Sequence, residues 1–278
     1  MSKIVNYELI TSTSSIQADM YGSRAKCLQR LIRLGLPVPQ SVALSVPFVN
    51  SIALGKSIDL KKLVTCFPAS PIISVRSSPV SAEWGGPSTI LNIGMNSEIE
   101  KVYSNTLGSF AARELHIKFI KSFAIEVMRL DDEIFDHINI TPEVAIDAYE
   151  QEIAECFPRT IEAQLSEVLK SMSRAWQGTS ARLLRASKGA ADDAGLGLVV
   201  QQMVFGLGKG ESGAGVIQFV DSDTGIKREI GRYLSQSQGR DALINKKAAI
   251  FLTKDDRGPS LEDTQPDIFY ELTQAGVN

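Results

Sequence analysis

The chain has 278 residues, of which 44% are hydrophobic and 22% charged, a composition typical of a globular protein with one large domain or two lobes. Its net charge of −3 provides no basic surface field, which argues against nucleic acid as a partner. No apolar run approaches the roughly 18 residues that a membrane-spanning helix needs, and the three cysteines lie far apart without a CxxC pair. We therefore expect a cytoplasmic protein with reduced thiols and no membrane partner.

The first predicted helix begins shortly after residue 20 and is expected to end at Gly35. Its apolar face is formed by five residues: Ala25, Leu28, Leu31, Ile32 and Leu34. Arg24 lies near the N-terminus of this helix, where backbone donors and the helix dipole favour an anion. A cation at that end is explained equally well by a bound phosphate or by solvent screening. A strand at 42–46 and a short helix at 58–66 are predicted next.

The stretch 72–94 holds the most informative pattern. Ile72, Ile73 and Val75 predict a buried strand that delivers Arg76 at its end, and small and polar residues with a Gly-Gly-Pro break at 85–87 follow. A guanidinium pairs bidentately with phosphate oxygens, and glycines let backbone N–H groups approach an anion. The pattern therefore suits a polyphosphate, although spacing alone favours the simpler alternative of a hairpin with a surface arginine.

The middle of the chain is predicted to be helical. A helix at 110–128 places Leu115, Phe119, Phe123 and Val127 at four-residue steps. Two more helices fill 141–176 with a break near 157–158, and the apolar stripe of the second is interpreted as core packing.

The C-terminal part is predicted to be rich in strands, beginning with an apolar strand at 196–205. The glycine-rich run 206–215 lacks the GK[ST] of a P-loop and opens no helix, so it is interpreted as the tip of a β-hairpin that could fold over a phosphate. A second hairpin turn at 221–225, a strand at 248–252 and a helix at 266–274 complete the pattern. Together these elements predict an α+β fold with two lobes.

Five ordered blocks of the sequence resemble the N-terminal nucleotide-binding domain of the pyruvate phosphate dikinase family, which includes phosphoenolpyruvate synthase and rifampin phosphotransferase. The blocks are GSRAKCLQRLIRLGLPVP, ISVRSSPVSAEWGGPSTILNIG, FAARELHIKFIKSFAIEVM, VVQQMVFG, and SGAGV with DSDTG. The resemblance implies one ATP-grasp domain over 1–278. Its parts would be a first lobe at about 1–105, a helical section at about 106–190 and a β-rich lobe at about 191–278. The lobes would close on ATP, with phosphate passing to a histidine on a separate domain.

The resemblance also implies roles for individual residues. Arg76 matches the family's phosphate-binding arginine, and Arg24 stands where the family has an ATP-contacting lysine; these two would be the catalytic residues. Gly85, Gly86 and Thr89 match the loop over the triphosphate.

The remaining implied contacts are with the nucleotide. Gln201, with the strand through Met203 and Val204, lies where the family reads adenine, and Lys118 stands where the family often has a basic residue. The loop 206–215, which includes Gly213, would enclose the phosphates.

Two departures from the family pattern bear on catalysis. Arg232 replaces an acidic residue, and the sequence ends at Asn278, ahead of the hairpin that carries the family's acidic Mg²⁺ ligands. The metal ligands of this chain are therefore unknown, and Glu211, Asp221 or Asp241 are candidate substitutes.

Two functions follow from this pattern. The first is an ATP- and Mg²⁺-dependent kinase-like domain that phosphorylates a small molecule or a partner protein, together with a separate phosphohistidine or substrate domain. The second is a catalytically degenerate nucleotide-binding, regulatory or scaffold module.

Overall fold

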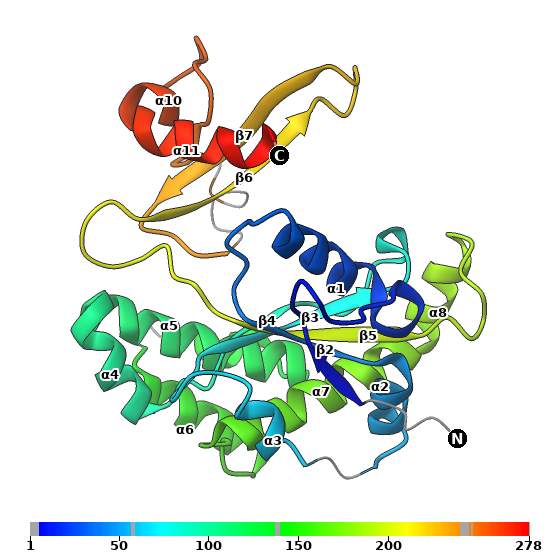
Figure 1. Cartoon of the computed structure of the whole chain (residues 1–278). Coiled ribbons are helices and arrows are strands. Elements are labelled where there is room, and N and C mark those ends of the chain that lie inside the picture. Colours follow the sequence, from blue (N-terminus) through cyan, green and yellow to red (C-terminus); the bar gives the residue numbers. More distant parts are fainter. Residues whose placement is uncertain (1–5, 57–58, 137–139, 240–244, 246, 278) are drawn as a thin grey trace. The chain divides into compact units, whose positions relative to one another are not determined.

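A computed structural model describes residues 6–56, 59–136, 140–239, 245 and 247–277. It contains helices and two antiparallel sheets, so the predicted α+β class is confirmed. The chain divides into two compact units (Figure 1). Unit 1 comprises Met1–Val102 and Ala112–Met203, and unit 2 comprises Tyr103–Ala111 and Val204–Asn278.

Unit 1 is built on a five-stranded sheet with the order β1-β2-β5-β3-β4, in which all neighbours are antiparallel. The strands are β1 (Tyr7–Leu9), β2 (Ser41–Leu44), β3 (Ile73–Pro79), β4 (Ile90–Ile93) and β5 (Leu196–Gln202). The predicted strand 196–205 is confirmed as β5, which ends at Gln202. Its apolar run is buried because the strand lies at the centre of the sheet, between β2 and β3.

Helix α1 (Ala18–Arg33) packs on one face of this sheet, and α7 (Ile161–Gln177) lies on the other (Figure 1). Only part of the predicted apolar face of α1 reaches the core. Ala25 is buried and Leu28 and Ile32 pack against the same cluster, whereas Leu31 and Leu34 are 38% and 50% exposed. The prediction was wrong for these two: Leu31 is on the exposed side of α1, and Leu34 follows the helix as its C-cap residue.

The helices α2 (Val46–Ala53), α3 (Lys61–Val64), α4 (Ser97–Leu107), α5 (Ser109–Ser122), α6 (Pro142–Ile153) and α8 (Thr179–Ala186) complete the principal helices before the second sheet. The predicted helix 110–128 is α5 followed by a π-helical turn at Phe123–Val127. The predicted break near 157–158 separates α6 from α7. The predicted helix 58–66 is reduced to α3, and its first residue, Ile58, lies outside the described residues.

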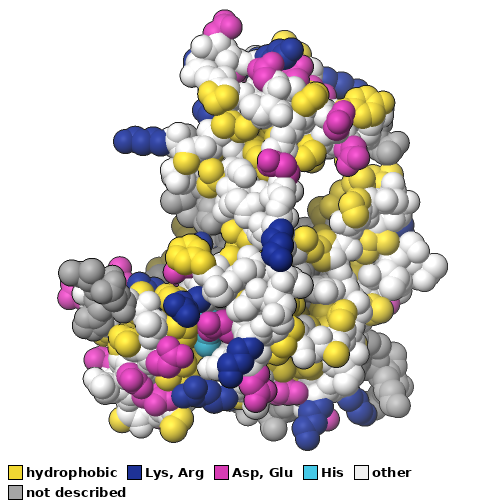
Figure 2. Space-filling view, turned by 90° about the vertical axis from the view of Figure 1, so that its left-hand side faces the viewer, with side chains coloured by type: hydrophobic (Ala, Val, Ile, Leu, Met, Phe, Trp, Pro, Cys, Tyr) yellow, Lys and Arg dark blue, Asp and Glu magenta, His cyan; other side chains and the backbone are white. Residues whose placement is uncertain are grey.

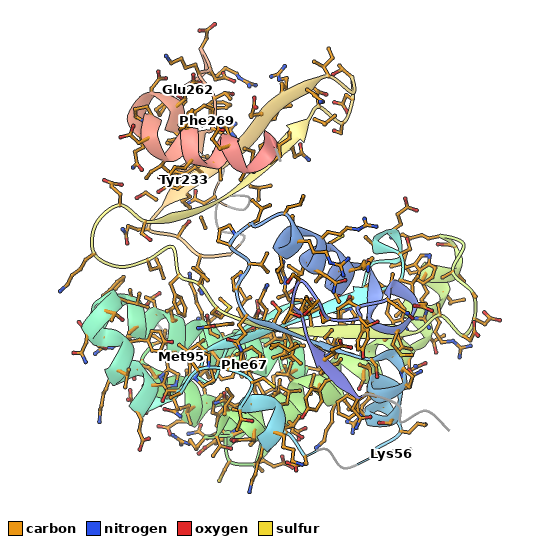
Figure 3. All side chains as sticks on the ribbon, viewed as in Figure 1. Lys56, Phe67, Met95, Tyr233, Glu262 and Phe269 are labelled. Atoms are coloured by element: carbon orange, nitrogen blue, oxygen red, sulfur yellow. The ribbon has the colours of Figure 1, made fainter. Side chains whose placement is uncertain are left out.

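An aromatic cluster joins these helices beneath the sheet. Phe123 and Tyr149 both pack against Phe157, with ring centroids 5.3 and 5.2 Å away, and Phe119 joins them at 6.0 Å from Phe157. The core of unit 1 also contains Met95, which is labelled in Figure 3 and fully buried.

The buried tyrosine in this cluster predicts a loss of stability at alkaline pH. Burial first, and then the charges of nearby glutamates, raise the pKa of Tyr149 to about 12. The folded state therefore holds its proton more tightly than the unfolded state, so its contribution is full below pH 10 and is lost as pH rises towards 12. With about 1.4 kcal/mol per pKa unit, the effect is on the order of 2 kcal/mol.

Urea unfolding at pH 8 and pH 11.5 tests this expectation. The Tyr149→Phe variant should lose less stability than the unmodified protein over this interval, whereas Tyr270→Phe, at an exposed tyrosine, should behave like the unmodified protein. Equal losses in all three proteins would contradict the assignment.

Unit 2 contains a three-stranded sheet with the order β6-β7-β8. The strands are β6 (Gly213–Val220), β7 (Lys227–Ser235) and β8 (Ile250–Phe251), and the helices α10 (Leu261–Thr264) and α11 (Pro266–Val277) follow. The interpretation of 206–215 as a hairpin tip was wrong. β5 and β6 belong to different sheets because β6 pairs with β7, and Gly206 bridges to Ser237. The glycine-rich run therefore connects one sheet to the other.

Candidate functional site

A polar patch lies on the face of the unit 1 sheet that also carries α1. In the register of β2, β5 and β3, Gln201 is paired with Ser41 on one side and with Ser74 on the other. Gln201 Nε2 donates a hydrogen bond to Ser41 Oγ at 2.9 Å, and Gln201 Oε1 accepts one from Arg76 Nη1 at 3.2 Å. Arg76 is two residues beyond Ser74 and so shares its face. The buried glutamine thus fixes one side of the Arg76 guanidinium.

The second guanidinium of this patch comes from α1. Arg24 Nε donates to the carbonyl oxygen of Ser77 at 2.8 Å, which brings the start of α1 to the strand that carries Arg76. Burial lowers the pKa of Arg24. Burial lowers the pKa of Arg76 too, and the charge of Arg24 lowers it further. Both groups stay protonated at neutral pH because arginine has an ordinary pKa above 12.

Neither arginine has an anionic partner in the part of the chain that the structure describes. No carboxylate there forms an ion pair with Arg24 or Arg76. Arg76 Nε is also buried without a hydrogen-bond partner among these residues. An unsatisfied buried N–H of a charged group is costly. Two like charges held together raise that cost, so the patch is suited to an anion with several oxygens.

Gly22 is what allows α1 to reach the strand. The helix is interrupted there by a backbone with φ 83° and ψ 166°, and a Cβ would lie 1.6 Å from the carbonyl oxygen of Ser78. Ser78 Oγ then donates to the carbonyl oxygen of Tyr21 at 2.9 Å and accepts from the N–H of Ala25 at 3.2 Å. The close approach of helix and strand therefore sets the position of Arg24.

The loop after β3 follows the strand closely. Gly85 has φ 73° and ψ −157°, a conformation that favours glycine. A Cβ on Gly86 would lie 2.6 Å from Ser77 Oγ, so this loop lies against β3 one residue beyond Arg76. Side chains of successive strand residues point to opposite faces. The contact thus places Gly86 beside the strand. That this loop covers a phosphate bound at Arg76 stays a prediction. Thr89 is exposed just before β4.

The other predicted site residues lie outside this hydrogen-bonded group. Met203 continues β5, with its N–H donating to the carbonyl oxygen of Ile72 at 2.9 Å, and the chain passes into unit 2 at Val204, which is exposed. Lys118 is exposed on α5. Gly213 begins β6 in unit 2, where a Cβ would meet the ring of Tyr233 at 2.5 Å, so close packing already accounts for this glycine.

Sequence reasoning missed the serines that support the arginines. Ser41 holds Gln201, and Ser77 supplies the carbonyl oxygen that Arg24 contacts. A signal was present in β3, where the polar Ser74, Arg76 and Ser78 fall at every second position, because a period of two marks one face of a strand.

The candidate metal ligands are engaged in local structure. Asp221 Oδ1 accepts from the backbone N–H groups of Asp223 and Thr224, which lowers its pKa, and Glu211 Oε2 accepts from Gln265 Nε2 at 2.6 Å. Asp241 lies outside the described residues. Within the described ranges no group of three or more His, Cys, Asp or Glu side chains could hold a metal ion.

Lys and Arg side chains are interleaved with Asp and Glu on the face shown in Figure 2, in keeping with the small net charge. No helix in the described part of the chain is long and apolar enough to span a membrane.

These features define an α+β protein of two units in which a helix and a strand of unit 1 carry two guanidinium groups that form no ion pair with any described carboxylate. No protein-family model matches the chain. Over 92% of its length it is 23% identical to pyruvate, phosphate dikinase of Rickettsia prowazekii, and over 93% it is 24% identical to that of Rhizobium meliloti. Over 74% it is 26% identical to chloroplastic pyruvate, phosphate dikinase of Flaveria bidentis.

The resemblance seen in the sequence motifs is confirmed: over most of its length the chain is similar to pyruvate, phosphate dikinases. It covers 34% of the length of the Rickettsia prowazekii and Rhizobium meliloti proteins and 23% of the Flaveria bidentis protein. The match falls in their N-terminal part.

Proposed function

We propose that this chain is a nucleotide-binding, kinase-like domain that binds ATP through its phosphates at Arg24 and Arg76. The observation that carries the proposal is the Arg76 guanidinium: its buried Nε has no hydrogen-bond partner among the described residues, and it forms no ion pair with a carboxylate in that part of the chain. The similarity to pyruvate, phosphate dikinases, whose name describes a phosphate-transferring protein, supports the same class of ligand.

Within this proposal each residue has a separate role. Gln201 holds Nη1 of Arg76, so the edge formed by Nε and the second terminal nitrogen is left to take two phosphate oxygens at once. Arg24 adds a second positive charge from the start of α1. Because both ends of the Gln201 amide are already bonded within the sheet, its role is to position Arg76, and the adenine is assigned instead to the segment at Met203 and Val204.

The phosphotransfer step is a separate part of the proposal. A bound Mg²⁺ would neutralise charge on the phosphate oxygens. Since the described residues provide no acidic cluster for it, we assign no step of the transfer to them. Transfer to a small molecule or partner protein, with the aid of a separate phosphohistidine or substrate domain, is the kinase form of the proposal. The alternative is a catalytically degenerate nucleotide-binding, regulatory or scaffold module, which the change of an acidic family residue to Arg232 favours.

A phosphate series tests the binding site. ATP should stabilise the protein most, ADP less and AMP least, with adenosine nearly inactive, because the two arginines contact phosphates and not the nucleoside. At a ligand concentration of 100 times Kd the added stability should be about 2.7 kcal/mol, measured as a shift in thermal unfolding. Stabilisation by adenosine equal to that by ATP would contradict the assignment.

A second experiment distinguishes the kinase form of the proposal from the binding or regulatory module. Incubation with ATP and Mg²⁺, followed by ³¹P NMR, shows whether any phosphoanhydride bond is broken. Consumption of ATP supports the kinase form, whereas ATP that binds and stays intact supports the binding or regulatory module.

A further inference from the structure

A second cationic feature lies within unit 2. A hollow of about 430 Å³ is lined by three basic side chains, those of Arg232, Lys247 and Arg257, and by Phe251. Residues 248–250 and 258–259 complete its lining. The volume is in the range of small-molecule sites. None of these residues belongs to the arginine patch of unit 1.

The strand register builds this hollow. Arg232 on β7 is directly paired with Phe251 on β8, so both side chains are on one face, and Arg232 Cζ lies 3.6 Å from the centre of the Phe251 ring. Tyr233, labelled in Figure 3, is the next residue of β7 and is paired with Ile250. Arg232 Nη1 also donates to the carbonyl oxygen of Ala249 at 3.3 Å. The ring and this carbonyl hold the guanidinium in place.

The chain after β8 returns to the same ring. The N–H of Phe251 donates to the carbonyl oxygen of Pro259 at 3.0 Å, and Arg257 Cζ lies 4.8 Å from the ring centre. Asp255 accepts from Arg257 Nε at 2.7 Å and from Nη2 at 2.6 Å. These hydrogen bonds first, and the more distant charge of Arg232 last, lower the pKa of Asp255 to about 2. Two guanidinium groups are therefore held around one aromatic ring.

Among the residues that the structure describes, the charges of this cluster do not balance. Asp255 pairs with Arg257, but neither Arg232 nor Lys247 forms an ion pair with a carboxylate in this part of the chain. Within the described residues, two positive charges are therefore left beside the hollow. Simple packing explains why the stem of Arg232 covers Phe251. It does not explain why three basic residues line the hollow beside a single paired carboxylate, that of Asp255. A phosphate monoester carries about −1.5 to −2 at pH 7, which matches this excess.

We propose that this hollow is an anion site of unit 2 that binds a small phosphorylated molecule. Arg232 takes the phosphate oxygens in a fork held against Phe251, and Lys247 adds the second charge. The proposal goes beyond nucleotide binding at Arg24 and Arg76, since it uses other residues and a different unit.

Isothermal titration of the full chain with inorganic pyrophosphate tests the site, in an Arg76→Met background that removes one of the two arginines of the first patch. Arg232→Met should weaken pyrophosphate binding at least tenfold, and Lys247→Met, at an exposed residue, should weaken it threefold to tenfold. Phe251→Leu keeps every charge and should still weaken binding because Arg232 loses its platform. Arg228→Met, at an exposed arginine of the same strand, is the matched control and should leave the affinity unchanged.

Each outcome bears on the proposal. Absence of pyrophosphate binding in the Arg76→Met background, or equal losses in Arg228→Met and Arg232→Met, would overturn the unit 2 site and leave the ATP proposal intact. If pyrophosphate binding depends on Arg232 but stabilisation by ATP is unchanged in Arg76→Met, the unit 2 site is supported and the ATP assignment is rejected. Circular dichroism would show whether Arg232→Met unfolds the protein. In that case Arg232→Lys and Lys247→Met test the proposal, because Arg232→Lys keeps a long side chain and Lys247→Met changes an exposed residue.

Discussion

Replacing Arg76 with methionine should strongly weaken the stabilisation of the protein by ATP. The substitution removes a guanidinium that has no anionic partner in the described part of the chain, and it leaves Arg24 alone at the patch. Truncating one partner of a desolvated charged hydrogen bond costs about 2 kcal/mol or more, so ATP affinity should fall at least roughly 30-fold. Thermal unfolding over an ATP titration measures the change.

Without ligand, the Arg76→Met protein should be at least as stable as the unmodified protein. Burial and the charge of Arg24 both disfavour the protonated guanidinium in the folded state, as the lowered pKa of Arg76 indicates. Its removal should therefore leave the free energy of unfolding unchanged or increase it, which is the pattern expected of a binding residue held at some cost to stability. A variant that is less stable and still responds fully to ATP would assign Arg76 to the fold alone.

Two arginines of α1 provide the matched control for this patch. Arg24 Nε donates to Ser77 O at 2.8 Å, and Arg33 Nε donates to Ser12 O at 2.8 Å near the other end of the helix. The two substitutions to methionine remove the same charge and the same kind of hydrogen bond. ATP stabilisation should fall in Arg24→Met and persist in Arg33→Met.

Hydrophobic periodicity predicted the parts of the fold in which a local pattern decides the structure. The stripe of α7 and the apolar run of β5 are buried as expected, because each follows one period over its whole length. Helix α2 was missed because Val46 seemed to extend the strand before it. Its start is set by Ser45, whose Oγ accepts from the N–H of Phe48, followed by a proline in the first turn.

The hydrogen bonds that hold the candidate site together could not be predicted in the same way. Local chemistry indicated Arg76, but the partners that hold it are distant in sequence. Gln201 is 125 residues from Arg76 and 160 from Ser41. These contacts exist because β5 inserts between β2 and β3, a pairing order that the sequence of each strand does not encode. The charge excess around Arg232 likewise depends on the pairing of β7 with β8.

Replacing Gly22 with alanine should produce the largest loss of stability among the variants considered. A Cβ would lie 1.6 Å from the carbonyl oxygen of Ser78, and the positive φ of 83° is unfavourable for any other residue. Backbone strain of about 1–3 kcal/mol and overpacking of about 1–3 kcal/mol together give an expected loss of roughly 2–6 kcal/mol. Urea unfolding measures it as a lower midpoint at unchanged slope.

Gly35 at the end of the same helix separates the two causes. It has φ 77°, but no atom lies within 4 Å of where its Cβ would be, so Gly35→Ala carries the strain without the clash and should cost about 1 kcal/mol. Gly22→Ala should also weaken the response to ATP, because pushing α1 from β3 breaks the contact of Arg24 with Ser77. Similar losses of stability in the two variants would mean that α1 does not depend on its close approach to the strand, and Arg24 would then need another support.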